Sequence, residues 1–280
     1  MNFLTSFMDF FQYDFLLRAL LGCIFVAIAC GIVSPLIVAK RYAFMGTAVS
    51  HSTFLGLSIA LSLVASKNSI SVFLITLAIT MILVLFLAKA TFRQKLPTDS
   101  LIGIFFTSSM GIGVIIHYLF ARQRGDLLGY LFGNLLLLEQ HDIILSLVLM
   151  LSLIPLFFIP LKKWLYVIYD EEGAYVSGIN IKFFHYLFFL ILTFLIVSAL
   201  KLAGTVLIET LLLVPGVFAL KLGRNIKQVF IFSISFSIIS SIFGLYLANL
   251  GDLPSGATMA VTQLLILVGF LVFKKIKGEN

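Results

Sequence analysis

Four ionisable side chains lie inside long apolar stretches of the chain, and two of them stand out, because the other two, His117 and His185, lie nearer the ends of their stretches, where headgroups or loops can satisfy them. Glu209 is the single acidic residue in any of these stretches, and His51 lies about two helical turns into the second of them. An ionisable group inside a bilayer is costly and commonly marks a functional site. A neutral imidazole and a carboxylate are ordinary ligands of divalent ions such as zinc, manganese or iron. These residue types therefore predict a cation site.

A third polar side chain shares a helix face with the histidine. Thr47 precedes His51 by four residues, which is the spacing of neighbours on one side of a helix. Spacing alone does not bring Glu209 to this face. The alternative is that the two groups are satisfied separately in a helix bundle, or that burial keeps Glu209 protonated. The candidate metal ligands are His51, Glu209 and Thr47.

The elements that must position these residues are membrane-spanning helices. The composition is 61% hydrophobic and 11% charged, and the mean hydropathy is +1.16. A helix needs about 20 apolar residues to cross a bilayer. The sequence therefore predicts an all-α, polytopic transmembrane bundle of about eight or nine spans that forms one domain over residues 1–280. The apolar stretches are Ala19–Ala39, Tyr42–Ser66, Asn68–Ala88, Ser100–Ala121, Ile143–Leu161, Phe183–Leu200, Leu202–Leu220, Gln228–Gly251 and Leu253–Phe273.

The basic residues predict the orientation. With nine spans and the N-terminus outside, 14 of the 19 Lys and Arg residues fall on the cytoplasmic side and 5 on the other. Such a bias is typical of the inner side of a membrane protein. We therefore expect a multi-pass protein of the bacterial cytoplasmic membrane with a cytoplasmic C-terminus. The net charge of +7 follows from this topology and does not indicate nucleic-acid binding.

Two polar connections are long enough to meet partner proteins. The outer one, Arg122–Asp142, contains Asp126 and Asn134. The inner one, Lys162–Lys182, has acids followed by Gly178, which is typical of a short helix with a glycine stop. No phosphate-binding Gly-x-x-x-x-Gly-Lys-Ser/Thr loop and no His-Glu-x-x-His motif occurs, so neither ATP hydrolysis in this chain nor a metal-dependent enzyme is expected.

Six segments, in order, resemble those of the bacterial metal-uptake ABC permeases of the zinc, manganese and iron (ABC-3) family. The family's second helix carries the signature Gly-Asp-Ala-x-Ser-His, and Arg41–Gly56 is similar to this helix. The other matching segments are Thr98–Gly103, Tyr130–Asn134, Asp170–Gly178, Ala203–Pro215 and Asp252–Thr258. One departure concerns the metal site, because Thr47 stands where the family has aspartate. We hypothesise that the acid has moved and that Glu209 replaces it. The alternative is a weaker or altered site with a changed metal preference.

The resemblance implies the membrane subunit of an ATP-driven importer for a divalent metal. Two copies would enclose the path, and zinc, manganese or ferrous iron would pass as cargo, with no permanently bound cofactor. A cytoplasmic ATPase would dock on Asp170, Glu171, Glu172, Gly173, Ala174 and Gly178. An extracytoplasmic metal-binding protein would face Asp126, Asn134 and Asp252. The alternative is an ion-coupled secondary carrier that uses Glu209 as its proton or cation site, although the matching halves common in such carriers are not apparent.

Overall fold

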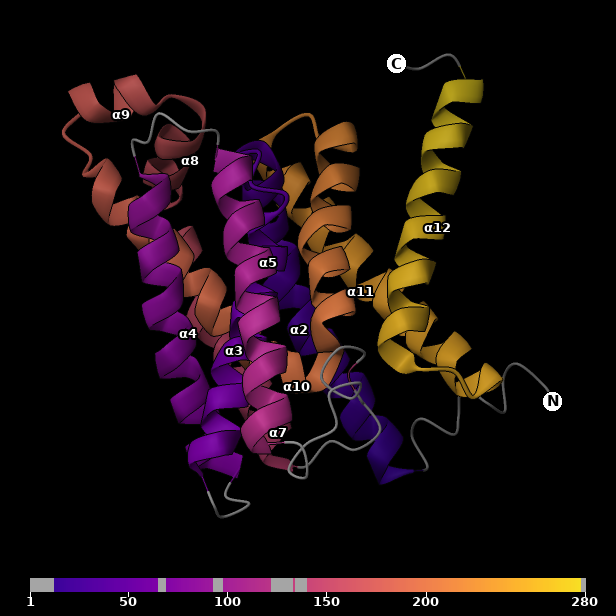
Figure 1. The fold of residues 1–280 in the computed structure, drawn as a ribbon. Coiled ribbons are helices and arrows are strands. Elements are labelled where there is room, and N and C mark those ends of the chain that lie inside the picture. The colour runs from indigo at the N-terminus through magenta and orange to yellow at the C-terminus, as the bar shows by residue number, and fades with distance from the viewer. Residues whose placement is uncertain (1–12, 65–68, 93–97, 122–132, 134–139, 278–280) are drawn as a thin grey trace.

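The computed structural model describes residues 13–64, 69–92, 98–121, 133 and 140–277, and the regular structure within them is helical (Figure 1). Apolar helices suit a bilayer because each backbone N–H and C=O is bonded within its own segment. The helices are α2 (Asp14–Ala39), α3 (Met45–Leu63), α4 (Ser69–Thr91), α5 (Thr98–Ile116), a π-helix η1 (His117–Ala121), α7 (Gln140–Phe158), α8 (Leu161–Tyr169), α9 (Glu171–Val176), α10 (Ile181–Leu222), α11 (Ile226–Gly251) and α12 (Ser255–Ile276).

The predicted number of membrane spans is confirmed for the described residues. Eight helical segments are long and apolar enough to cross a membrane, and α7 with α8 makes a possible ninth, bent by 70° at the break between them. The start of α2 and the end of α12 lie at opposite ends of the bundle (Figure 1). An odd number of crossings gives this arrangement.

Helix α10 is two spans joined at one residue. Gly204 has φ 70° and ψ 167°, a conformation that only glycine adopts readily. The boundary between the two predicted apolar stretches, which end at Leu200 and begin at Leu202, lies close to this turn. Both ends of α10 lie near the end of α2. Phe188, near the start of α10, packs on Tyr42, which follows α2. The Gly216 N–H, near the end of α10, donates to the Ser34 hydroxyl at 2.7 Å. The two halves therefore form a hairpin.

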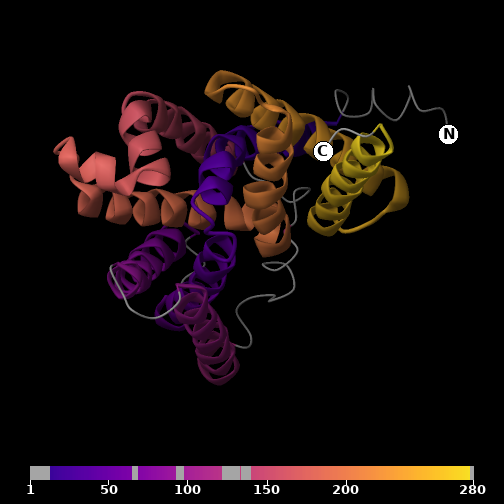
Figure 2. The same cartoon turned by 90° about the horizontal axis from the view of Figure 1, so that it is seen from above.

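Burial separates a central layer from a peripheral one. About 72% of the spanning window is buried in α2 and in the first half of α10, against 22% in α4 and in α5 and 33% in α12. Figure 2 shows α2 among α10, α11 and α7, with α12 at one edge. The exposed apolar faces of α4, α5 and α12 suit contact with lipid or with another protein.

One end of the bundle carries the short helices α8 and α9, and we call it the α9 end (Figure 1). Helices α3 and α5 begin there, and α4 and α12 finish there. Asp170 accepts a hydrogen bond from the Gly173 N–H at 2.8 Å and so caps α9, and Gly178 follows with φ 72°. The short helix expected within residues 162–182 is present as α9.

Candidate functional site

The two ionisable groups singled out in the sequence lie side by side. The His51 Nε2 atom is 3.7 Å from Glu209 Oε1. The histidine comes from α3 and the glutamate from the second half of α10. Their side chains are 13% and 26% exposed, so they are partly shielded and still accessible. The contact provides one nitrogen and one carboxylate at a single point between two membrane helices.

Thr47 belongs to the same group. Its hydroxyl lies beside the Glu209 carboxylate. Because Thr47 and His51 share one face of α3, both reach Glu209 from the same side. All three predicted metal-site residues are therefore neighbours in the structure. The acid opposite His51 is supplied across the helix interface and not from α3 itself.

Small residues on α3 allow the neighbouring helices to come close. A Cβ added to Gly46 would lie 3.2 Å from Leu212 Cδ1 on α10. A Cβ added to Gly56 would lie 2.5 Å from Thr80 Oγ1 on α4. Glycine at both positions lets α3 pack tightly on either side. The close packing at Gly46 is what brings the second half of α10, and Glu209 with it, to the His51 face.

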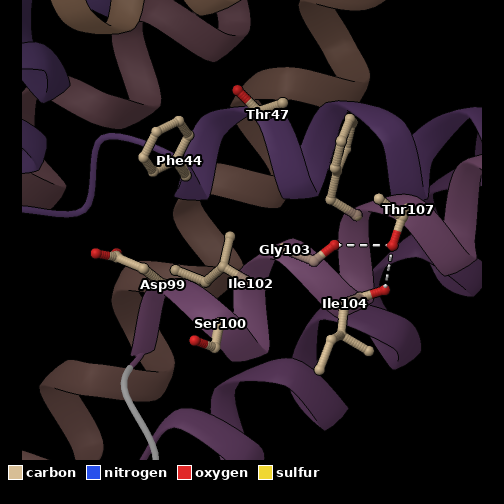
Figure 3. Close-up of a pocket in the computed structure, with 9 residues that line it drawn as sticks. Phe44, Thr47, Asp99, Ser100, Ile102, Gly103, Ile104 and Thr107 are labelled. Atoms are coloured by element: carbon tan, nitrogen blue, oxygen red, sulfur yellow. Dashed lines mark hydrogen bonds between the residues drawn. The ribbon is translucent and has the colours of Figure 1, made fainter.

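A pocket of about 720 Å³ opens beside this group, between the starts of α3 and α5 (Figure 3). Thr47 lines it from α3, and Asp99 and Phe106 line it from α5. The Phe106 ring also packs edge-on against the His51 imidazole, with centroids 4.5 Å apart. The pocket is therefore lined by Phe106, which contacts the histidine, and by Thr47, which lies beside the glutamate. No pattern of chemical residue types marked Phe106, because phenylalanine is common throughout the apolar stretches of this chain.

The donor set of a single chain is small. Among the described residues, no group of three or more His, Cys, Asp or Glu side chains could hold a metal ion. Within the same part of the chain, the His51 Nδ1 atom is buried without a hydrogen-bond partner. A transition metal takes four or more ligands. One copy of the pair must therefore be completed by water, by the threonine hydroxyl or by a second chain.

The other two histidines whose side chains the structure describes, His185 and His117, are buried. His185 Nε2 lies 2.9 Å from the Ala88 carbonyl oxygen and ties α10 to α4. His117 is buried at the start of η1. Neither joins an acidic side chain, so the cation site is best assigned to His51 and Glu209.

The acidic end of α9 is exposed, and its opposite side packs into the protein. Ala174 is fully buried in the core, whereas Tyr175 and Val176 are 69% and 85% exposed. Asp170, Glu171 and Glu172 are exposed at the start of the helix. Two large apolar side chains facing outward are typical of a surface that meets another protein. Tyr175 and Val176 lie within residues 170–180, the segment expected to meet the ATPase.

Residues predicted to face a partner at the opposite end are described in part. Asp252 is exposed and adopts the left-handed conformation, φ 50°, where α11 ends. Asp126 and Asn134 lie outside the described residues. Their neighbour Gly133 rests on the α10 turn, where an added Cβ would lie 2.5 Å from the Ala203 carbonyl carbon. Gly133 itself therefore lies against the Gly204 turn.

The fold defines a polytopic helical membrane protein in which a histidine and a carboxylate meet between two of the helices. Comparison with known proteins then identifies the family. Residues 12–274 match the model of the ABC 3 transport family, and the chain belongs to that family. It is a membrane-spanning permease subunit of an ABC transporter, in which ATP hydrolysis is the work of a separate subunit. The family assignment favours this class over the ion-coupled secondary carrier.

Three similar proteins illustrate the relationship. The manganese transport system membrane protein MntC of Halalkalibacterium halodurans is 33% identical over 93% of this chain and 88% of its own length. A probable iron transport system membrane protein of Haemophilus influenzae is 28% identical over 95% and 96%. The solved structure of PsaBC from Streptococcus pneumoniae in complex with Fab has a TM-score of 0.83 at 26% identity, covering 95% and 94%.

Proposed function

We propose that this permease passes a divalent transition-metal ion across the bacterial cytoplasmic membrane, with His51 and Glu209 as the ligands that hold the ion in transit. The observation that carries the proposal is the 3.7 Å approach of His51 Nε2 to Glu209 Oε1. The hydroxyl of Thr47 lies beside the same carboxylate and adds an oxygen to the site. Manganese, ferrous iron and zinc all accept this pair of ligands, and similar proteins are named for manganese and for iron.

The cargo passes between two copies of the permease. One copy supplies a single imidazole and a single carboxylate to the ion. Two copies related by a two-fold axis would supply two of each, which meets the coordination number of four usual for zinc, and water would complete the six ligands usual for manganese. The exposed apolar face of α5, which also borders the pocket at Asp99 and Phe106, is available for the second copy.

Two soluble partners complete the importer. The ATPase docks on α9 from the cytoplasm through Asp170, Glu171, Glu172, Gly173 and Gly178 and through the exposed Tyr175 and Val176. The buried Ala174 serves by anchoring this helix to the core. The extracytoplasmic binding protein delivers the ion at the other end, near Asp126, Asn134 and Asp252. The excess of basic residues at the α9 end supports this orientation, with the N-terminus outside.

Metal uptake by single variants tests the site. We expect His51→Ala and Glu209→Gln each to lower uptake of the physiological metal at least tenfold, since each removes one of the two ligands. Thr210→Val is the matched control, because the Thr210 hydroxyl donates to the Val206 carbonyl of its own helix at 2.7 Å. Uptake is measured with manganese, iron and zinc supplied singly to a strain lacking the native permease. Unchanged uptake and metal preference in both ligand variants would reject the site.

A further inference from the structure

Six basic residues gather at the α9 end of three neighbouring helices, and we call them the basic cluster. Three lie where α10 passes into α11, and three lie at the end of α12. They are Lys221, Arg224, Lys227, Lys274, Lys275 and Lys277. Lys274 is half-buried and the other five are exposed.

A direct contact joins the two groups of three. The Lys274 ammonium nitrogen donates to the Lys221 carbonyl oxygen at 3.4 Å. The ends of α10 and α12, distant in sequence, therefore present their charges together. The contact also uses the carbonyl that the end of α10 leaves unpaired.

No acidic residue of these segments balances the charge. The sequence contains no Asp or Glu between Glu209 and Asp252, and none between Asp252 and Glu279. Like charges gathered at the same end of neighbouring helices repel one another. A bound anion with more than one negative charge would relieve the repulsion.

The surface directly below the cluster is suited to acyl chains. Phe218 packs on Phe236 at 4.4 Å and on Phe270 at 4.8 Å, which closes the gap between α10, α11 and α12. On the outer face of α12, Phe273 is 57% and Ile276 is 78% exposed. Cationic headgroup contacts above an exposed apolar helix face are the features of a phospholipid site.

We propose that the basic cluster binds the headgroup of an anionic phospholipid and prefers a lipid with two phosphates to a lipid with one. The lipid lies in the leaflet at the α9 end, with its phosphates between the end of α12 and the α10–α11 connection. This edge of the bundle is opposite to α9 in the view of Figure 2. The site is therefore separate from the helix proposed for ATPase docking and from the His51–Glu209 pair.

Membrane orientation alone does not account for this grouping. A positive-inside bias depends on how many basic residues lie on one side and not on whether they touch one another. Lys89, Lys162, Lys163 and Lys182 also lie at the α9 end, on other helices, and are exposed. They provide a matched set of four charges for an experiment.

Lipid binding to the purified permease tests the proposal. The protein is held in nanodiscs of zwitterionic phosphatidylcholine, and cardiolipin or phosphatidylglycerol is titrated in while bound lipid is counted by native mass spectrometry. We expect Lys221→Gln/Arg224→Gln/Lys274→Gln/Lys275→Gln to weaken cardiolipin binding at least tenfold, since each charge near an anionic lipid is worth on the order of fivefold. The variant Lys89→Gln/Lys162→Gln/Lys163→Gln/Lys182→Gln should stay within twofold of the unaltered protein.

Several outcomes would overturn the proposal. Equal loss in both variants would show a general effect of net charge. Displacement of cardiolipin by millimolar inorganic phosphate would show an anion site without a role for lipid. If the fourfold cluster variant bound lipid normally but no longer bound the ATPase subunit, the cluster would be a protein interface and not a lipid site. If the fourfold variant fails to fold, Lys221→Gln/Arg224→Gln provides the same comparison against Lys162→Gln/Lys163→Gln.

Discussion

Glu209 Oε1 lies 3.7 Å from His51 Nε2, and the same carboxylate lies beside the hydroxyl of Thr47, one turn before the histidine on α3. The acid and the threonine thus occupy adjoining volumes although they come from different helices. This contact links the departure at Thr47 from the family signature to the presence of an acid in the second half of α10.

Exchanging the two side chains tests whether the acid has changed helices. Glu209→Thr alone should lower metal uptake at least tenfold, and adding Thr47→Asp should restore most of it. The reason is that the carboxylate returns to the same space next to His51. The measurement is uptake of manganese and zinc as a function of concentration in cells carrying each variant. A double variant no better than Glu209→Thr would show that the two positions are not interchangeable.

Phe106 is expected to orient His51. Its ring packs edge-on against the imidazole at a centroid distance of 4.5 Å, and such pairs contribute roughly 0.5–1.5 kcal/mol. Phe106→Ala should therefore lower the maximal uptake rate about threefold to tenfold, and Phe106→Tyr should keep most of it. Ile104→Ala is the control, because Ile104 lines the same pocket and is 65% exposed. If both alanine variants behave alike, the effect belongs to the pocket and not to the histidine.

Gly216 is expected to be essential for packing α10 on α2. An added Cβ there would lie 2.6 Å from the Ser34 carbonyl oxygen. Gly216→Ala should destabilise the protein by about 1–3 kcal/mol, the usual cost of overpacking, and lower the Tm measured in detergent. Gly269→Ala is the control, because nothing lies within 4 Å of its added Cβ, and alanine favours helix. Its Tm should be equal or higher.

Lys40 and Tyr42, between α2 and α3, should report on the charge of Glu171 at the start of α9. Burial lowers the pKa of Lys40, while Glu171 raises it. Burial, with a further contribution from Glu171, raises the pKa of Tyr42 to about 12. Glu171→Gln should therefore lower the pKa of both groups. NMR titration of dimethylated lysines and ultraviolet titration of tyrosinate measure these shifts.

The same two groups give opposite dependences of stability on pH. For Lys40 the unfolded chain holds its proton to higher pH, so stability rises with pH between the folded and unfolded pKa values. For Tyr42 the folded protein holds its proton longer, so its contribution is complete below pH 10 and lost as pH rises to about 12. In the Tyr42→Phe variant, denaturation measured in detergent at each pH should no longer show the loss of stability above pH 10. An unchanged alkaline profile in that variant would contradict it.

Membrane helices could be predicted from the sequence because the bilayer acts on each segment separately. Every segment must satisfy its own backbone and match the hydrocarbon thickness, so apolar length alone marks a span. This accounts for the correct number of spans and for the break between Leu200 and Leu202. The start of α9 was also predictable from the local sequence, because Asp170 caps the helix with its own side chain.

What the sequence determined by itself was therefore the set of helices, their polar exceptions and the family signature around His51. Only the tertiary structure decided that Glu209 meets His51, that Phe106 packs on the imidazole and that Lys274 reaches Lys221. The physical reason is that these contacts depend on which helix faces meet. That choice follows from close packing at positions such as Gly46 and Gly216, where the shapes of two distant segments must fit at once.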